Sequence, residues 1–99
     1  MGGNSSSYPT VLYGENGRDG YVFYRDKEGD IQMYFEFGGG DCVAIINVPS
    51  EKEWVSKTKR PLAERNGILK FIAEQVIIDK APNSYYKITD RYIEIFENK

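Results

Sequence analysis

Three cations, Lys59, Arg60 and Arg65, are the residues of this sequence whose types and spacing best suit a specific chemistry, the binding of an anion. They flank the start of a segment with helical periodicity. The free N–H groups and partial positive charge of a helix N-terminus attract anions, and cationic side chains there reinforce the attraction. We therefore predict a site for an anion or an acidic partner. The alternative is that these side chains are simply solvated, or that Arg65 pairs with a carboxylate of its own chain.

Most catalytic and metal-binding systems lack the residues they need in this sequence. The chain has one cysteine, Cys42, and no histidine. This excludes a disulfide within the chain, a Cys/His zinc site, and nucleophilic systems that use a histidine base. A carboxylate pair such as Glu36 and Glu94 would act as acid and base only if adjacent strands brought the two together. We therefore predict no cofactor and no metal, and the sequence favours a protein that is not an enzyme.

Three short segments have the composition of known motifs but not their spacing. The glycines at 38–40 precede a predicted strand, whereas a phosphate loop precedes a helix. The carboxylates at 26–30 lack the twelve-residue register of a calcium loop. The aromatic residues at 20–23 lack the basic and small residues of an RNA-binding strand. We interpret these segments as a hairpin connection, a solvated turn and an ordinary strand.

The charge and hydropathy of the chain exclude further classes of partner. A net charge of −2 over 99 residues gives no electrostatic basis for binding nucleic acid or an anionic membrane. No segment approaches the roughly 20 apolar residues of a membrane span, and no apolar signal segment follows Met1. We therefore expect a cytoplasmic protein with neither nucleic-acid nor membrane partners.

The first eight residues differ in composition from the rest of the chain. Residues 1–8 are small and polar, which predicts a disordered tail, and residues 9–99 form a single domain. Gly2 and Ser6 match the pattern for N-myristoylation, but no basic cluster follows that would strengthen a single acyl anchor. We interpret this segment as a flexible tail.

One long amphipathic helix, residues 61–81, must position the candidate sites. Its apolar residues share one stripe at helical spacing: Leu62, Ile68, Leu69, Ile72, Ala73 and Val76. Pro61 suits the first helical position, and Pro82 ends the helix because it disfavours a helical residue before it.

A smaller apolar patch lies on another side of the same helix. Phe71 and Ile78 are one heptad apart, and Gly67 lies next to them and allows close approach. Such a patch either packs within its own domain or contacts another chain. We predict it as a possible interface formed by Gly67, Phe71 and Ile78.

The remaining elements are strands. Segments 10–13, 21–25, 31–37 and 42–48 predict a meander, with an Asn16-Gly17 type I′ turn after the first strand. Ser50 and Glu53 form a capping-box pattern before a short helix that carries Trp54. Segments 85–89 and 92–96 predict a hairpin that pairs Ile88 with Ile93. The fold class is α+β: an antiparallel sheet of five to six strands, packed on one long amphipathic helix.

These observations favour a non-catalytic protein-interaction module, either an adaptor, an inhibitor of the immunity type, or a homodimer. The absence of catalytic residues, the two-faced helix and the tyrosine-rich strands support it, because tyrosine is enriched at interfaces. We expect a protein partner or a second copy of the chain. The alternative is a domain, with or without enzymatic activity, that binds a small ligand or an anion through Lys59, Arg60 and Arg65.

Overall fold

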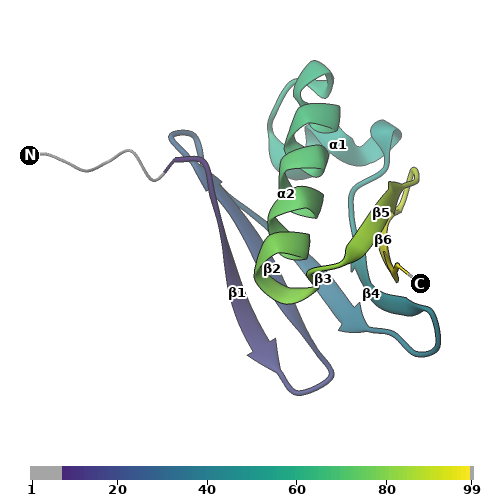
Figure 1. Cartoon of the computed structure of the whole chain (residues 1–99). Helices are drawn as coiled ribbons and strands as arrows, with labels where there is room; N and C mark the ends of the chain where they lie inside the picture. The colour runs from purple at the N-terminus through teal and green to yellow at the C-terminus, as the bar shows by residue number, and fades with distance from the viewer. Residues whose placement is uncertain (1–7, 99) are drawn as a thin grey trace, which may run out of the picture.

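The computed structural model describes residues 8–98, which form a six-stranded antiparallel sheet and two helices (Figure 1). The strands lie in the order β1-β2-β3-β4-β6-β5. Their bounds are β1 (Thr10–Asn16), β2 (Asp19–Asp26), β3 (Gly29–Phe37), β4 (Cys42–Asn47), β5 (Ser84–Ile88) and β6 (Tyr92–Glu97). Helix α1 (Glu51–Thr58), the 3-10 turn η2 (Leu62–Glu64) and helix α2 (Arg65–Lys80) lie between β4 and β5. The predicted α+β fold, a meander plus a C-terminal hairpin on one long helix, is confirmed.

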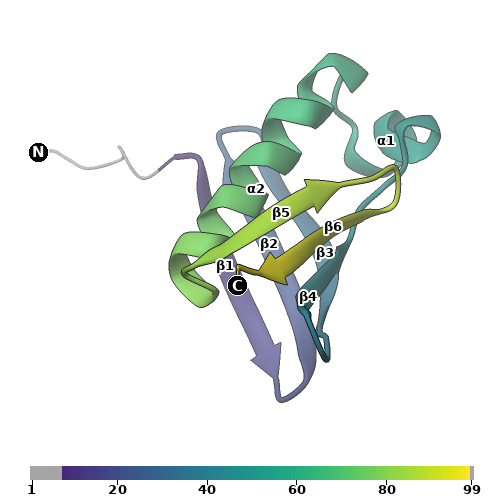
Figure 2. The same ribbon diagram turned by 45° about the vertical axis from the view of Figure 1, so that its right-hand side comes forward.

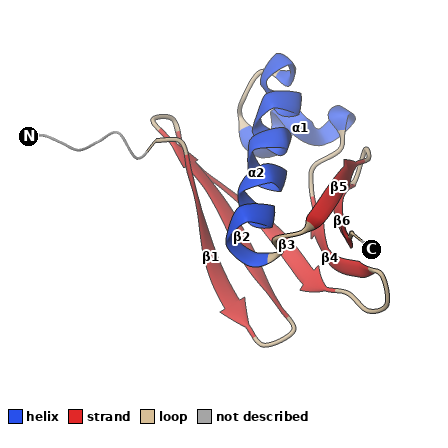
Figure 3. Ribbon diagram, in the orientation of Figure 1, coloured by secondary structure: helices blue, strands red, loops and turns tan. Residues whose placement is uncertain are grey.

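Helix α2 covers one face of the sheet, with β1 on one side of it, β5 and β6 on the other, and β3 crossing behind it (Figures 1 and 3). The stripe on α2 packs against side chains from β2, β3, β4 and β6 because each strand turns alternate residues toward the helix. The most deeply buried large side chains come from α1, α2, β2, β4 and β6: Trp54, Ile46, Leu69, Ile72, Ile93, Ile95 and Val22.

The turn between β1 and β2 differs from the prediction. Asn16 pairs with Asp19, so the two loop residues are Gly17 and Arg18 rather than Asn16 and Gly17. Gly17 has φ +75, and Arg18 is not among the described residues with positive φ. A positive φ at only the first loop residue is the pattern of a type II′ turn, which also matches the twist of the flanking strands.

Helix α1 begins as the capping-box pattern predicts. The Ser50 hydroxyl accepts a hydrogen bond from the backbone N–H of Glu53. Trp54 is completely buried, and its Nε1 donates to the backbone carbonyl of Pro61 at 3.0 Å. The single tryptophan therefore fastens α1 to the loop that leads into α2.

The long helix is shorter than predicted at its N-terminal end. Pro61 has extended backbone angles, and a 3-10 turn over Leu62–Glu64 precedes the α-helix that starts at Arg65. The change of helix type turns Leu62 away from the stripe, so that 47% of its surface is exposed. At the other end α2 stops at Lys80, before Pro82, as predicted.

The C-terminal hairpin has the predicted register, with Ile88 opposite Ile93 and Tyr86 opposite Ile95. Its turn reaches α1, because Asp90 Oδ1 accepts from the backbone N–H of Glu51 at 2.9 Å. The hairpin turn, the start of α1 and the start of α2 are thereby held together (Figure 2).

The predictions for the N-terminal segment, a flexible tail and a myristoylation pattern, lie almost entirely outside the residues that the structure describes. The predicted tail comprises residues 1–8, of which only Tyr8 is described, and Gly2 and Ser6 lie outside the description.

Neither α1 nor α2 has the length and apolar character that a transmembrane helix requires.

Candidate functional site

Arg60, one of the three predicted anion-binding residues, is buried in an ion pair. Its Nη1 and Nη2 lie 2.6 and 2.8 Å from the two carboxylate oxygens of Asp26, at the end of β2. Nη2 also donates to the carbonyl of Gly29 at 3.1 Å. Only 6% of the Arg60 side chain is exposed. The charge of Arg60 is therefore used inside the fold.

Arg65 is also buried, but it contacts a different part of the protein. Its Nε donates to the carbonyl of Pro49 at 3.1 Å, and its Nη2 donates to the carbonyl of Asp90 at 2.8 Å. Lys59 is exposed and has a left-handed backbone conformation that ends α1. The structure thus does not gather Lys59, Arg60 and Arg65 around one point, because each side chain serves a different element.

The predicted helix patch is only partly covered by its own chain. The Phe71 ring meets the Tyr24 ring edge-on, with centroids 5.9 Å apart, whereas Ile78 remains 70% exposed. A Cβ at Gly67 would meet no atom within 4 Å, so no described residue makes use of its small size. Phe71 therefore belongs to the domain, and Ile78 is left in solvent by the described residues.

Glu36 and Glu94 do not form a carboxylate pair. Both face Ile45 of β4, Glu36 from β3 and Glu94 from β6, so that one strand lies between them. The two carboxylates are instead members of a row that crosses the sheet. They share its outer face, opposite α2, because cross-strand partners point the same way.

We call this outer surface the open face, since no helix within residues 8–98 covers it (Figure 2). One row of side chains crosses five strands in register. It runs Asp19, Glu36, Ile45, Glu94 and Lys87. Beside it lie further outward side chains that are aromatic or carry an amide, among them Tyr21, Phe23, Gln32, Tyr34, Asn47, Tyr92, Phe96 and Tyr85.

The aromatic side chains of the open face contact one another. Tyr21 and Tyr34 are cross-strand partners whose rings meet edge-on at 5.8 Å, and Tyr85 stacks on Phe96 at 5.4 Å. Several remain accessible, with exposed fractions of 43% for Tyr21 and 51% for Tyr85. These contacts between rings restrict the motion of the side chains.

The electrostatics of the open face are dominated by carboxylates. Asp19 lies directly opposite Glu36 across β2 and β3. The Tyr34 hydroxyl donates to Asp19 Oδ2 at 2.8 Å. This hydrogen bond, together with desolvation and the charges of Asp19 and Glu36, raises the pKa of Tyr34 to about 12. The hydrogen bond to Asp19 is the largest cause, and the charges of the two carboxylates add to it.

Sequence reasoning missed the open face, although part of the signal was present. The alternation in β3 placed Tyr34 and Glu36 on the side away from Ile31 and Met33. The alignment with Glu94 depends on β4 pairing with β6, a contact between strands far apart in the chain. Strand alternation finds the outward residues of each strand, but only the sheet order reveals the row.

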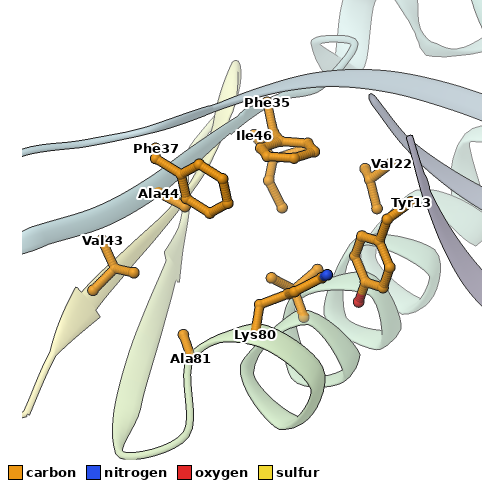
Figure 4. A pocket seen from close by; sticks show the side chains of 10 residues that line it. Tyr13, Val22, Phe35, Phe37, Val43, Ala44, Ile46, Lys80 and Ala81 are labelled. Carbon is orange, nitrogen blue, oxygen red and sulfur yellow. The ribbon is translucent and has the colours of Figure 1, made fainter. Parts of the chain in front are cut away.

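An apolar pocket lies between the sheet and the C-terminal end of α2, and Tyr13 and Lys80 lie at its edge (Figure 4). Its free volume is about 20 Å³, roughly the space that one water occupies. Lys80 pairs with Glu15 and lies over the Tyr13 ring, 4.6 Å from its centroid. With so little room, the pocket is a packing feature of the core rather than a ligand site.

Within residues 8–98, no three Cys, Asp or Glu side chains come together in a way that would hold a metal ion. The fold defines the chain as an α+β domain with an open antiparallel sheet. Comparisons with models of protein families, with curated proteins and with solved structures find no match to this chain. A functional assignment therefore depends on the surfaces described above.

Proposed function

We propose that this chain is a non-catalytic protein-interaction module, an adaptor or an inhibitor of the immunity type, whose open face binds a basic protein. The observation that carries the proposal is the alignment of Asp19, Glu36 and Glu94 in one row beside accessible tyrosines. Tyrosines supply contact area at low entropic cost, and carboxylates supply complementarity to lysine and arginine.

The position of Asp19 opposite Glu36 supports a binding role. Like charges directly opposite each other weaken a sheet, so this arrangement does not serve the stability of the fold. By contrast, Arg25 and Asp30, which are also cross-strand partners on this sheet, neutralise each other through two hydrogen bonds. A cation from a partner would relieve the repulsion between Asp19 and Glu36, and binding energy would be gained there.

The same charges favour a different protein over a second copy of this chain. Two open faces in contact would bring two rows of carboxylates together, with Lys87 as the only cation in each row. The proposal retains the cytoplasmic location expected from the sequence, in agreement with the free thiol of Cys42. The alternative function, anion binding through Lys59, Arg60 and Arg65 together, loses support because Arg60 already binds Asp26.

A titration with a peptide rich in lysine and arginine tests the proposal. Backbone amide resonances of β2, β3, β4 and β6 should shift, and the affinity should fall as salt is added. The double variant Asp19→Asn and Glu36→Gln should bind on the order of tenfold more weakly. The matched control is Glu28→Gln with Glu64→Gln, which removes the same charge from exposed positions off the open face. Equal loss in both double variants would show binding by net charge alone and would overturn the proposal.

Site-specific photo-crosslinking distinguishes the open face from the helix patch. A photoreactive residue replaces Tyr92 on the open face or Ile78 on α2, and both positions are exposed. The proposal predicts adducts with another protein from position 92 and none from position 78. Adducts from position 78 alone would assign the interface to Gly67, Phe71 and Ile78, and adducts of twice the chain mass would assign a homodimer.

A further inference from the structure

An open cleft lies where the start of α1, the first turns of α2 and the β5–β6 turn meet. Its volume is about 710 Å³. Two hydrogen bonds fix its walls: Val48 N donates to the backbone carbonyl of Arg91, and Glu51 N donates to the side-chain Oδ1 of Asp90, each at 2.9 Å. The cleft is lined by three cations, two carboxylates, three neutral polar side chains and one apolar side chain: Lys52, Arg65, Lys70, Glu51, Asp90, Asn66, Thr89, Tyr86 and Ile88.

The charge of Arg65 is buried and only weakly compensated. Its side chain is 5% exposed, yet its two hydrogen bonds go to backbone carbonyls, of Pro49 and Asp90, rather than to a carboxylate. The nearest carboxylate oxygen, Asp90 Oδ1, is 3.8 Å from Nη2, and it already accepts the N–H of Glu51. Buried charges are normally paired. Arg65 thus has one long ion pair, with Asp90, and the cleft carries three cations against two carboxylates, which leaves an excess of positive charge for an anion.

Lys52 and Lys70 add mobile charge to this fixed cation. Both are exposed, and neither forms an ion pair with a carboxylate in the described part of the chain. They come from different walls, Lys52 from α1 and Lys70 from α2, so they approach the cleft from two sides. Asn66 lines the same cleft, and its side-chain amide can donate hydrogen bonds.

We infer that this cleft binds a phosphate group, either as free phosphate or carried on a small molecule. The guanidinium of Arg65 is held in a fixed position and suits a tetrahedral oxyanion. The flexible ammonium groups of Lys52 and Lys70 can neutralise the second negative charge of the phosphate. This site is independent of the proposed function, because it lies on the helix-bearing side and shares no residue with the open face. Of the three predicted anion-binding residues, it uses only Arg65.

Titration of the full chain, first with inorganic phosphate and then with AMP, tests the inference. Amide resonances of Asn66, Thr89 and Asp90 should shift and saturate. Lys70→Ala should weaken binding on the order of tenfold, since a charge-assisted contact is lost. The matched control is Lys27→Ala, an exposed lysine in the β2–β3 turn that lies away from the cleft. It should leave the affinity unchanged.

The possible results distinguish three cases: a site for free phosphate, a site for a phosphorylated small molecule, and no specific site. Equal affinities for inorganic phosphate and AMP assign free phosphate, and tighter binding of AMP assigns a phosphorylated small molecule. Shifts that stay linear up to high concentration, or an equal loss in Lys27→Ala, overturn the inference. Because the amides concerned belong to the cleft, failure here leaves the peptide titration of the open face unaffected.

Discussion

Arg60 binds the carboxylate of Asp26, a residue 34 positions earlier in the chain, with both of its terminal nitrogens. The pair joins the loop between the two helices to the end of β2, and Arg60 also lies over the Tyr24 ring, 5.8 Å from its centroid. Side-chain exposures of 6% for Arg60 and 19% for Asp26 place this pair inside the fold. It is a structural contact that fixes the start of the helical layer on the sheet.

Truncation of Arg60 should destabilise the protein strongly. Arg60→Ala leaves the Asp26 carboxylate largely buried without its partner, and the loss of such a partner costs about 3 kcal/mol. The free energy of unfolding, measured by chemical denaturation, gives this value directly.

The chain contains a matched control for this prediction. Arg25 and Asp30 form a two-bond pair of similar geometry, with hydrogen bonds of 2.8 and 3.1 Å, but both side chains are more than 40% exposed. Arg25→Ala should lower stability far less, because solvent and salt screen an exposed pair. Equal losses in the two variants would contradict the role assigned to burial.

The Asp26 pair also predicts a dependence of stability on pH. Hydrogen bonds from Arg60 and from the backbone N–H of Glu28 hold the pKa of the Asp26 carboxyl below its usual range. A lowered folded-state pKa stabilises the protein above the unfolded-state pKa, near about 4, and this stabilisation is lost as the pH falls further. The difference in stability between wild type and Asp26→Asn should therefore be constant from pH 7 to pH 5 and shrink below pH ~4. Denaturation curves at a series of pH values measure it, and a difference that grows in acid would refute it.

Local patterns predicted the elements of the fold because each has a local physical cause. The stripe on the long helix identified Ile68, Leu69, Ile72, Ala73 and Val76, all of which are buried. Leu62 was the exception, since a 3-10 turn breaks the helical spacing before Arg65. The hairpin register followed from the assumption that Asp90 and Arg91 form a two-residue turn, which places Ile88 opposite Ile93.

The candidate sites could be predicted less well, because their partners lie far away in the chain. Nothing in the sequence near Arg60 indicates Asp26, and nothing near Arg65 indicates the carbonyls of Pro49 and Asp90. A run of cations therefore looked like one exposed site, although the fold buries two of the three. The open face likewise depends on β4 lying beside β6.

The helix patch gives a prediction that separates packing from interaction. Phe71→Ala should cost about 2 kcal/mol, because the half-buried ring loses its contact with Tyr24. Ile78→Ser should change stability by less than about 0.5 kcal/mol, since Ile78 is 70% exposed. Thermal and chemical denaturation of the two variants measure these values. A large loss in Ile78→Ser would mean that a second chain, or part of this chain beyond the described residues, covers the position.

The negative potential of the open face can be measured through Tyr34. The hydrogen bond to Asp19 and the nearby carboxylates raise the pKa of its phenol to about 12. A raised folded-state pKa means that the neutral phenol stabilises the fold below the unfolded-state pKa, near about 10, and that this contribution is lost as the pH rises toward 12. Glu36→Gln should lower the pKa of Tyr34, and Asp19→Asn should lower it further, because Asp19 both accepts the hydrogen bond from the Tyr34 hydroxyl and carries a negative charge. Carbon NMR of labelled tyrosine, assigned with Tyr34→Phe, follows this titration. Glu28→Gln, which removes the same charge at the β2–β3 turn, should leave the Tyr34 pKa unchanged. A similar fall in that variant would show that net charge, rather than the row of carboxylates, sets the potential.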